Sequence, residues 1–149
     1  MKLKKLDALL VPRADMYSGE EVPDDEERLK YITNFSGSAG HAIISANSEV
    51  KSVLFSDGRY ELQLKKEVDP KYFDCLIGRF KDTCFFLKKN EKKIKNIGID
   101  PWLLTLKQYE LLKSLLKSSK IRFKLVDKNL IDEIWTKKNF VVKNKIFEI

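Results

Sequence analysis

Short apolar runs alternate along this chain with stretches whose apolar positions recur at helical spacing, and this alternation predicts an α/β domain. The first run, LDALLVP at 6–12, is typical of a buried strand. The next stretch carries Pro23 and then four consecutive acids. Carboxylates offset the positive end of a helix dipole, so a helix is predicted to begin there, with an apolar face made by Leu29, Ile32 and Phe35.

The middle of the chain predicts a hairpin followed by helices and strands in alternation. In order, we interpret the segments as strand, strand, helix, strand, short helix and strand: HAIISAN, VKSVLFSD, GRYELQLKKEV, YFDCLIG, DTCFFLKKN and KNIGID. The first two strands would form the hairpin around a short turn at 47–49. Pro101 is expected to end the last strand, because it lacks a backbone N–H.

The segment LLTLKQYELLKSLLKSSK is the clearest helix. Its apolar side would carry Leu104, Tyr109, Leu112, Leu115 and Leu116, and its water side Lys113, Lys117 and Lys120. Such a helix can bind a partner or lie on a membrane surface. Its place between the predicted strands NIGID and RFKLVD favours a crossover helix packed on a sheet.

The end of the chain divides into a closing helix and a tail. NLIDEIW predicts a short helix whose Trp135 packs back on the core, which closes the domain at residue 136. The remaining residues, 137–149, show no clear period and are predicted to begin a linker to a following domain.

Composition favours one water-soluble domain in the cytoplasm. The 149 residues are 43% hydrophobic and 34% charged, and no apolar run is long enough to span a bilayer. The start, MKLKKLDALLVP, superficially resembles a signal peptide. Asp7 interrupts its apolar run and no small-residue cleavage pattern follows, so a first strand is the better interpretation.

Cysteines and charge exclude several classes of site. Cys75 and Cys84 form no CxxC pair and are expected to be apolar core residues rather than a disulfide framework or zinc site. The net charge of +7 comes from residues 61–149, with 21 basic and 12 acidic side chains, against 8 and 10 before them. Most of the excess is scattered lysine, which predicts a solvated surface and no nucleic-acid binding.

The turn SGSAGH is the one stretch that invites a catalytic interpretation. A nucleophile elbow would need G-x-S-x-G between a strand and a helix, whereas Ser38 lacks the first glycine and its turn leads into a strand. A phosphate loop also needs a following helix. Gly37 and Gly40 are therefore expected to serve a tight turn that requires positive φ or close backbone approach.

Metal chemistry and strand-end carboxylates give no firm site. One histidine, two separated cysteines and scattered carboxylates make no cluster with metal-ligand spacing. Asp57 and Asp100 follow predicted strands, a place favoured both for functional carboxylates and for helix caps, and the cap is the commoner role. The residues by themselves therefore indicate no active site.

Four stretches, taken in order, resemble a known family. They are LDALLVPRADMYSGEEVPDDEERLKYITNFSGSAGHAII, FSDGRYELQ, IGIDPW and NLIDEIW. Their order and spacing are similar to the N-terminal domain of Xaa-Pro aminopeptidases, the aminopeptidase P enzymes of the creatinase/prolidase group. The VPRAD…GE wording resembles the longer, three-domain bacterial form. The resemblance covers 6–135, nearly the whole chain.

The resemblance implies a fold and a division of labour. The fold would be a single α/β domain with a mixed, mostly parallel six-stranded sheet and helices on both faces. In this family a separate C-terminal domain binds two metal ions, commonly manganese, through two Asp, one His and two Glu. None of those motifs is found here, so this chain would hold no cofactor. Its implied partners are its own catalytic domain, a second copy in a homodimer and peptide substrates, without nucleic acid or membrane.

The family domain helps to assemble the oligomer and rims the entrance to the catalytic site. The resemblance implies that the loops at 35–40 and 57–60 supply such contacts, and the candidate residues are Tyr17, Phe35, Ser36, Ser38, His41, Asp57, Arg59 and Tyr60. Arg59 would either pair locally with Asp57 or reach a carboxylate on another domain. Related sequences usually carry a histidine where this chain has Tyr17 and Ser18, so that histidine's contribution is absent or altered here.

Two alternatives stay open at this point. One is a free-standing interaction module, as in the large subunit of the histone chaperone FACT, although a charge of +7 would repel a basic partner such as a histone. The other is a creatinase or prolidase parent, which the GSAG and DGRY combination fits less well.

Overall fold

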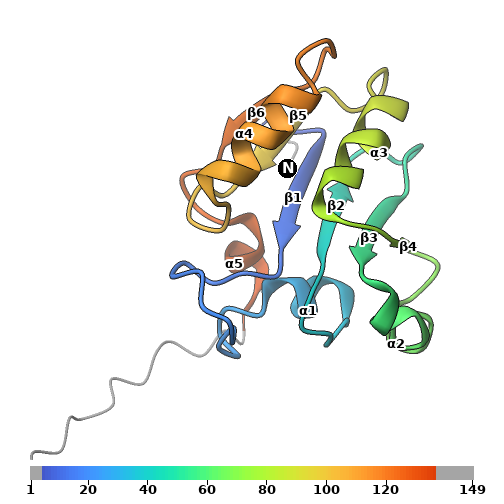
Figure 1. The fold of residues 1–149 in the computed structure, drawn as a ribbon, viewed down its shortest axis with the longest axis vertical. Coiled ribbons are helices and arrows are strands. Elements are labelled where there is room, and N and C mark those ends of the chain that lie inside the picture. Colours follow the sequence, from blue (N-terminus) through green and yellow to red (C-terminus); the bar gives the residue numbers. More distant parts are fainter. Residues whose placement is uncertain (1–4, 137–149) are drawn as a thin grey trace, which may run out of the picture.

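A six-stranded mixed sheet forms the centre of the computed structural model, which describes residues 5–136 (Figure 1). The strand order is β4-β3-β2-β1-β5-β6. The strands are β1 (Ala8–Pro12), β2 (His41–Ser45), β3 (Ser52–Ser56), β4 (Phe73–Ile77), β5 (Asn96–Ile99) and β6 (Arg122–Leu125). Only β2 runs against the others, because its pairs with β1 and β3 are antiparallel and the remaining pairs are parallel. The predicted mixed, mostly parallel sheet is confirmed.

Helices cover both faces of this sheet. The helices are α1 (Arg28–Thr33), α2 (Glu61–Glu67), α3 (Thr83–Lys89), α4 (Leu106–Leu115) and α5 (Leu130–Ile134), with 3-10 turns η2 (Gly58–Tyr60) and η3 (Phe80–Asp82). Buried side chains of α3 and α4 share one core cluster, and those of α1, α2 and α5 share the other. The predicted helices on both faces are therefore confirmed.

The central strand β1 shows how the sequence pattern builds two cores. Ala8 and Leu10 belong to the cluster under α3 and α4, while Leu9 and Val11 belong to the cluster under α1 and α2. Successive side chains of a strand point to opposite faces, so a strand buried on both faces is apolar at every position.

The helix predicted to begin in the acidic stretch begins only at Arg28, and that prediction of its start was wrong. The last two acids are engaged elsewhere. Glu26 and Asp132 both bind the buried Arg28 guanidinium, and Glu27 binds Arg13 at 2.7 Å. A buried Arg28 and a partly buried Arg13 require carboxylate partners, so these acids serve ion pairs rather than a helix dipole.

Two other predictions on side-chain burial need correction. The crossover helix α4 packs through Leu112 and Leu116 as predicted, but Leu115 is exposed. Cys84 is buried as expected, whereas Cys75 is only half-buried, because β4 is an edge strand and has β3 as its one strand neighbour within the described residues 5–136. Trp135 stacks on Tyr31 with ring centroids 4.7 Å apart, which confirms its predicted packing. The predicted linker, 137–149, lies outside the described residues.

Candidate functional site: the loops at the carboxyl edge of the sheet

The loops singled out in the sequence come together at one edge of the sheet. Because β2 is antiparallel to its neighbours, the turn before it meets the segments that follow β1 and β3. This edge carries α1 and α2 at the bottom of Figure 1. Ser38 Oγ lies 2.5 Å from the hydroxyl oxygen of Tyr60, which joins loop 35–40 to segment 57–60. We call these two segments the edge loops.

Phe35 anchors the first edge loop. Its side chain is 1% exposed and meets the Tyr60 ring edge-on, with centroids 5.7 Å apart. A Cβ on Gly37 would lie 2.2 Å from the Phe35 ring, and one on Gly40 would meet a backbone oxygen at 3.0 Å. Close approach is thus the reason for both glycines. The positive φ of this turn falls instead on Asn34, at 63°, which ends α1.

Ser36 is held by a carboxylate from α2. Its backbone N–H donates to Glu67 Oε2 at 2.8 Å, and its hydroxyl donates to Oε1 at 2.9 Å. Gln63 Nε2 donates to both Ser36 Oγ and Glu67 Oε1. Burial raises the pKa of Glu67, but the hydrogen bonds from Ser36 and Gln63 outweigh burial and leave the pKa below its ordinary value. Ser36 is therefore clamped in place by Glu67 and Gln63 of α2, two partners that sequence reasoning missed.

Arg13 fixes the same loop from the other side. Its Nη1 donates to the Ser38 carbonyl oxygen at 3.1 Å while its Nη2 pairs with Glu27. The hydrogen bond from Ser38 lowers the pKa of Tyr60 below its ordinary value. Arg13 follows directly after β1 in the PRAD stretch, the only sequence signal that could have pointed to it.

Asp57 and Arg59 form the local pair that was one of the two expected outcomes. The Arg59 backbone N–H donates to Asp57 Oδ1 at 2.9 Å, so the carboxylate caps η2, and Arg59 Nη2 donates to Oδ2 at 2.7 Å. These hydrogen bonds lower the pKa of Asp57. The Arg59 side chain stays 75% exposed, with its guanidinium 5.5 Å from the centre of the Tyr60 ring. Asp100 likewise caps a turn by accepting from the Trp102 N–H at 2.9 Å.

The structure keeps two candidate residues apart from the edge loops. His41 is buried on the opposite face of the sheet, where its Nε2 lies 2.8 Å from Thr83 Oγ1 and its ring stacks on Phe55. Burial lowers the pKa of His41 to about 4, so the ring is neutral at pH 7. Tyr17 is 84% exposed on the loop after β1, and its backbone N–H donates to Asp15. Ser38 bonds to Tyr60 and His41 bonds to Thr83, so these two residues are not paired with each other.

The arrangement of the edge loops is suited to recognition of another protein surface. Among residues 5–136, no three His, Cys, Asp or Glu side chains converge to hold a metal ion. None of the helices in the described part of the chain is long and apolar enough to cross a membrane. The edge loops instead present hydroxyls bonded to one another and an exposed arginine beside an aromatic ring, an arrangement suited to contact with another protein surface.

Comparison with known proteins agrees with this picture. Residues 1–134 match the family described as the creatinase/prolidase N-terminal domain. Aminopeptidase P1 of Lotus japonicus is 31% identical over 130 residues, which are 87% of this chain and 19% of that protein. Xaa-Pro aminopeptidase 1 of Dictyostelium discoideum is 33% identical over 141 residues, which are 90% of this chain and 22% of that protein.

A solved structure shares the fold. The X-prolyl aminopeptidase of Caenorhabditis elegans, described as a cytosolic enzyme with a di-nuclear active site, superposes with a TM-score of 0.79 at 24% identity. The match covers 92% of this chain and 22% of that one. The chain thus spans about a fifth of the length of the relatives that it matches.

Proposed function

Because the chain belongs to the creatinase/prolidase N-terminal domain family and its relatives are Xaa-Pro aminopeptidases, we propose that it is the non-catalytic N-terminal domain of such an enzyme. The parent enzyme would remove the N-terminal residue that precedes proline in a peptide. Within it, this domain would assist oligomer assembly and form part of the rim of the catalytic entrance.

The observation that carries this proposal is the network of hydrogen bonds that holds the edge loops. Ser36 is clamped by Glu67, Ser38 is clamped by Arg13 and Tyr60, and Arg59 remains exposed above that frame. A loop held by charged and aromatic partners keeps its shape when a second domain docks, so little ordering entropy is lost on contact. The geometry suits a preformed contact surface for the catalytic domain.

The candidate residues would act in different ways. The exposed Arg59 and Tyr17 would touch the neighbouring domain or peptide directly, and Asp57 would hold Arg59 in place. Phe35 and His41 lie in the interior and would support the edge loops and β2 from below. Ser36, Ser38 and Tyr60 would set the shape of the surface.

The metal ions of the proposed parent belong elsewhere. The side chains of residues 5–136 do not fit a divalent metal, so a pair of manganese ions would have to be bound by the catalytic domain. The proposal also includes peptide substrates, a homodimer, a cytoplasmic location and the three-domain bacterial form of the enzyme. It includes no nucleic-acid or membrane partner.

Peptide hydrolysis tests this assignment. The 149-residue chain alone, with Mn²⁺, is expected to cleave no Xaa-Pro tripeptide. A chimera in which it replaces the matched segment of the Dictyostelium enzyme is expected to cleave the tripeptide, while the same enzyme without that segment is the control. Turnover by the chain alone would contradict the proposal. A folded chimera without activity would favour the alternative, an interaction module without peptidase activity.

A further inference from the structure

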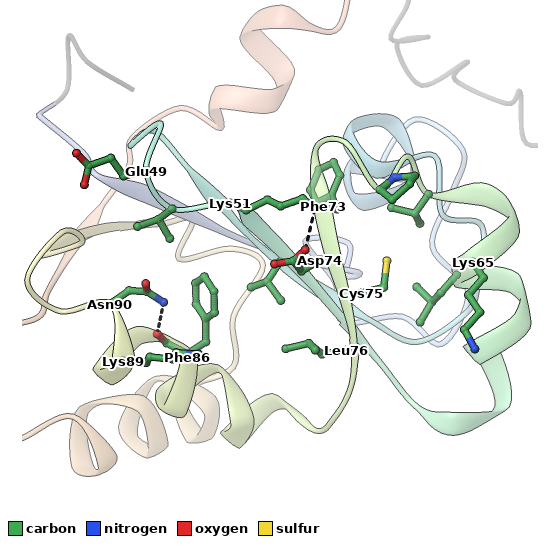
Figure 2. Close-up of a pocket in the computed structure, with 15 residues that line it drawn as sticks. Glu49, Lys51, Lys65, Phe73, Asp74, Cys75, Leu76, Phe86, Lys89 and Asn90 are labelled. Atoms are coloured by element: carbon green, nitrogen blue, oxygen red, sulfur yellow. Dashed lines mark hydrogen bonds and ion pairs between the residues drawn. The ribbon is translucent and has the colours of Figure 1, made fainter.

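A groove of about 790 Å³ runs along the β4 edge of the sheet, between α2 and α3 (Figure 2). We call it the edge groove. Its apolar lining comes from α2, β4 and α3 and includes Leu64, Val68, Phe73, Cys75, Leu76 and Phe86. Its volume falls within the range of about 300–1,000 Å³ that is typical of ligand pockets. The edge groove lies along β4, at the side of the sheet, whereas the edge loops lie where the strands end. The use of the groove is therefore independent of the function proposed above.

The backbone of β4 is available along this groove. β4 is the last strand of the sheet and, among residues 5–136, pairs with β3 alone. The Gly78 N–H donates to the Ser56 carbonyl at 2.9 Å, so residues two and four positions earlier also turn their N–H and C=O groups toward β3. The backbone groups of Cys75 and Ile77 therefore point outward, into the position that a further strand would occupy.

Apolar side chains accompany this free edge. Leu76 is 44% exposed and Ile77 is 50% exposed. In Figure 2, Leu76 points to the side of β4 that faces Phe86 on α3, while Cys75 points to the opposite side, toward α2. An added strand would thus bury apolar surface on both sides of its own backbone. Alternating side-chain pockets of this kind give specificity when a peptide joins a sheet edge.

The charges around the groove indicate which peptide fits. Three lysines line it, Lys51, Lys65 and Lys89, against two carboxylates, Glu49 and Asp74. Lys51 pairs with Asp74, and Lys65 pairs with Glu61 on α2, both in exposed ion pairs that contribute little to stability. These cations can therefore turn to a new partner at small cost.

The same charges disfavour a second copy of this chain as the occupant. Each groove carries a positive excess of three lysines over two carboxylates, so two copies paired edge to edge would bring like net charges together, which opposes such contact. We infer that the edge groove binds an extended acidic segment of another protein, which adds to β4 as a further strand. Its backbone pairs with the outward groups of β4, one apolar side chain packs against Leu76 and Phe86, and its carboxylates reach Lys65 and Lys89.

Model peptides test this inference. A fluorescent Glu-Val-Glu-Val-Glu-Val peptide is expected to bind the 149-residue chain, measured by fluorescence anisotropy at low salt, and a Lys-Val-Lys-Val-Lys-Val peptide to bind at least about tenfold more weakly. Saturation with the acidic peptide should also slow alkylation of Cys75 by iodoacetamide. The buried Cys84 serves as the internal reference.

Charge reversal supplies the matched variants. Lys65→Glu with Lys89→Glu is expected to lower affinity for the acidic peptide about tenfold, while Lys117→Glu, an exposed position after α4, should leave it unchanged. Equal binding of both peptides, or binding without protection of Cys75, would overturn the inference. Concentration-dependent dimers that protect Cys75 would overturn it as well, in favour of a second copy.

Discussion

His41 provides the sharpest test of the physical reasoning, because it is the only histidine of the sequence. Its ring is buried between Phe55 and Phe80, and its Nε2 bonds to Thr83. Burial lowers the pKa of this ring to about 4, against 6.5 for an exposed histidine. In the unfolded chain the ring takes up a proton near pH 6.5, whereas in the folded protein it stays neutral until about pH 4.

The sign and size of the effect follow from these two pKa values. Between them the unfolded state binds more protons than the folded state, so the free energy of unfolding falls as the pH falls through this window. One pKa unit corresponds to about 1.4 kcal/mol. Between pH 7 and pH 5 this linkage lowers the free energy of unfolding by about 2 kcal/mol. No other side-chain type ordinarily titrates in that interval.

Urea unfolding at pH 7, 6 and 5, followed by circular dichroism, measures this loss. The variant His41→Gln keeps a polar group at this position but has no ring to protonate, so its stability should be nearly constant over the interval. Thr83→Val removes the hydrogen-bond partner and leaves the ring buried, so it should retain the pH dependence. Equal slopes for the parent chain and His41→Gln, or an NMR titration of His41 near pH 6.5, would refute the reasoning.

Three further predictions concern folding stability, each measured by urea unfolding at pH 7. Gly37→Ala should lower the free energy of unfolding by about 1–3 kcal/mol, because its Cβ would overlap the Phe35 ring. The control Gly58→Ala, whose added Cβ would have its nearest neighbour atom 3.9 Å away, should change stability little, and equal effects would contradict the role of Gly37. Arg28→Ala should cost about 3 kcal/mol because it leaves Glu26 and Asp132 without their buried cation, whereas Arg59→Ala should change stability little because its ion pair is exposed. Asn129→Ala should cost about 1 kcal/mol, since Asn129 Oδ1 accepts from the Ile131 N–H to cap α5 and its amide donates to Asp100. An unchanged midpoint of urea unfolding would argue against the cap.

Local pattern was enough to predict the elements and their order. The β2–β3 hairpin, the crossover helix α4 and the caps at Asp57 and Asp100 all depend on residues close together in the sequence, so periodicity and turn chemistry reveal them. The ordered motifs likewise pointed to the family, which the match of residues 1–134 confirms.

Other features depend on contacts between distant residues. The start of α1 was misplaced because Glu26 and Glu27 serve arginines, one of which is also bound by Asp132 near the far end of the chain. The clamp on Ser36 comes from Glu67, 31 positions away. Neither pairing leaves a local signal, so residue spacing alone could not reveal it.

The sequence by itself determined which segments become strands and helices and which family the chain joins. Only the tertiary structure decided which strand lies at the edge, which face His41 enters and which carboxylate meets which cation. The order of strands in a sheet is set by the packing of both faces together. That order leaves β4 at the free edge, which is why Cys75 is half-buried and why the edge groove exists.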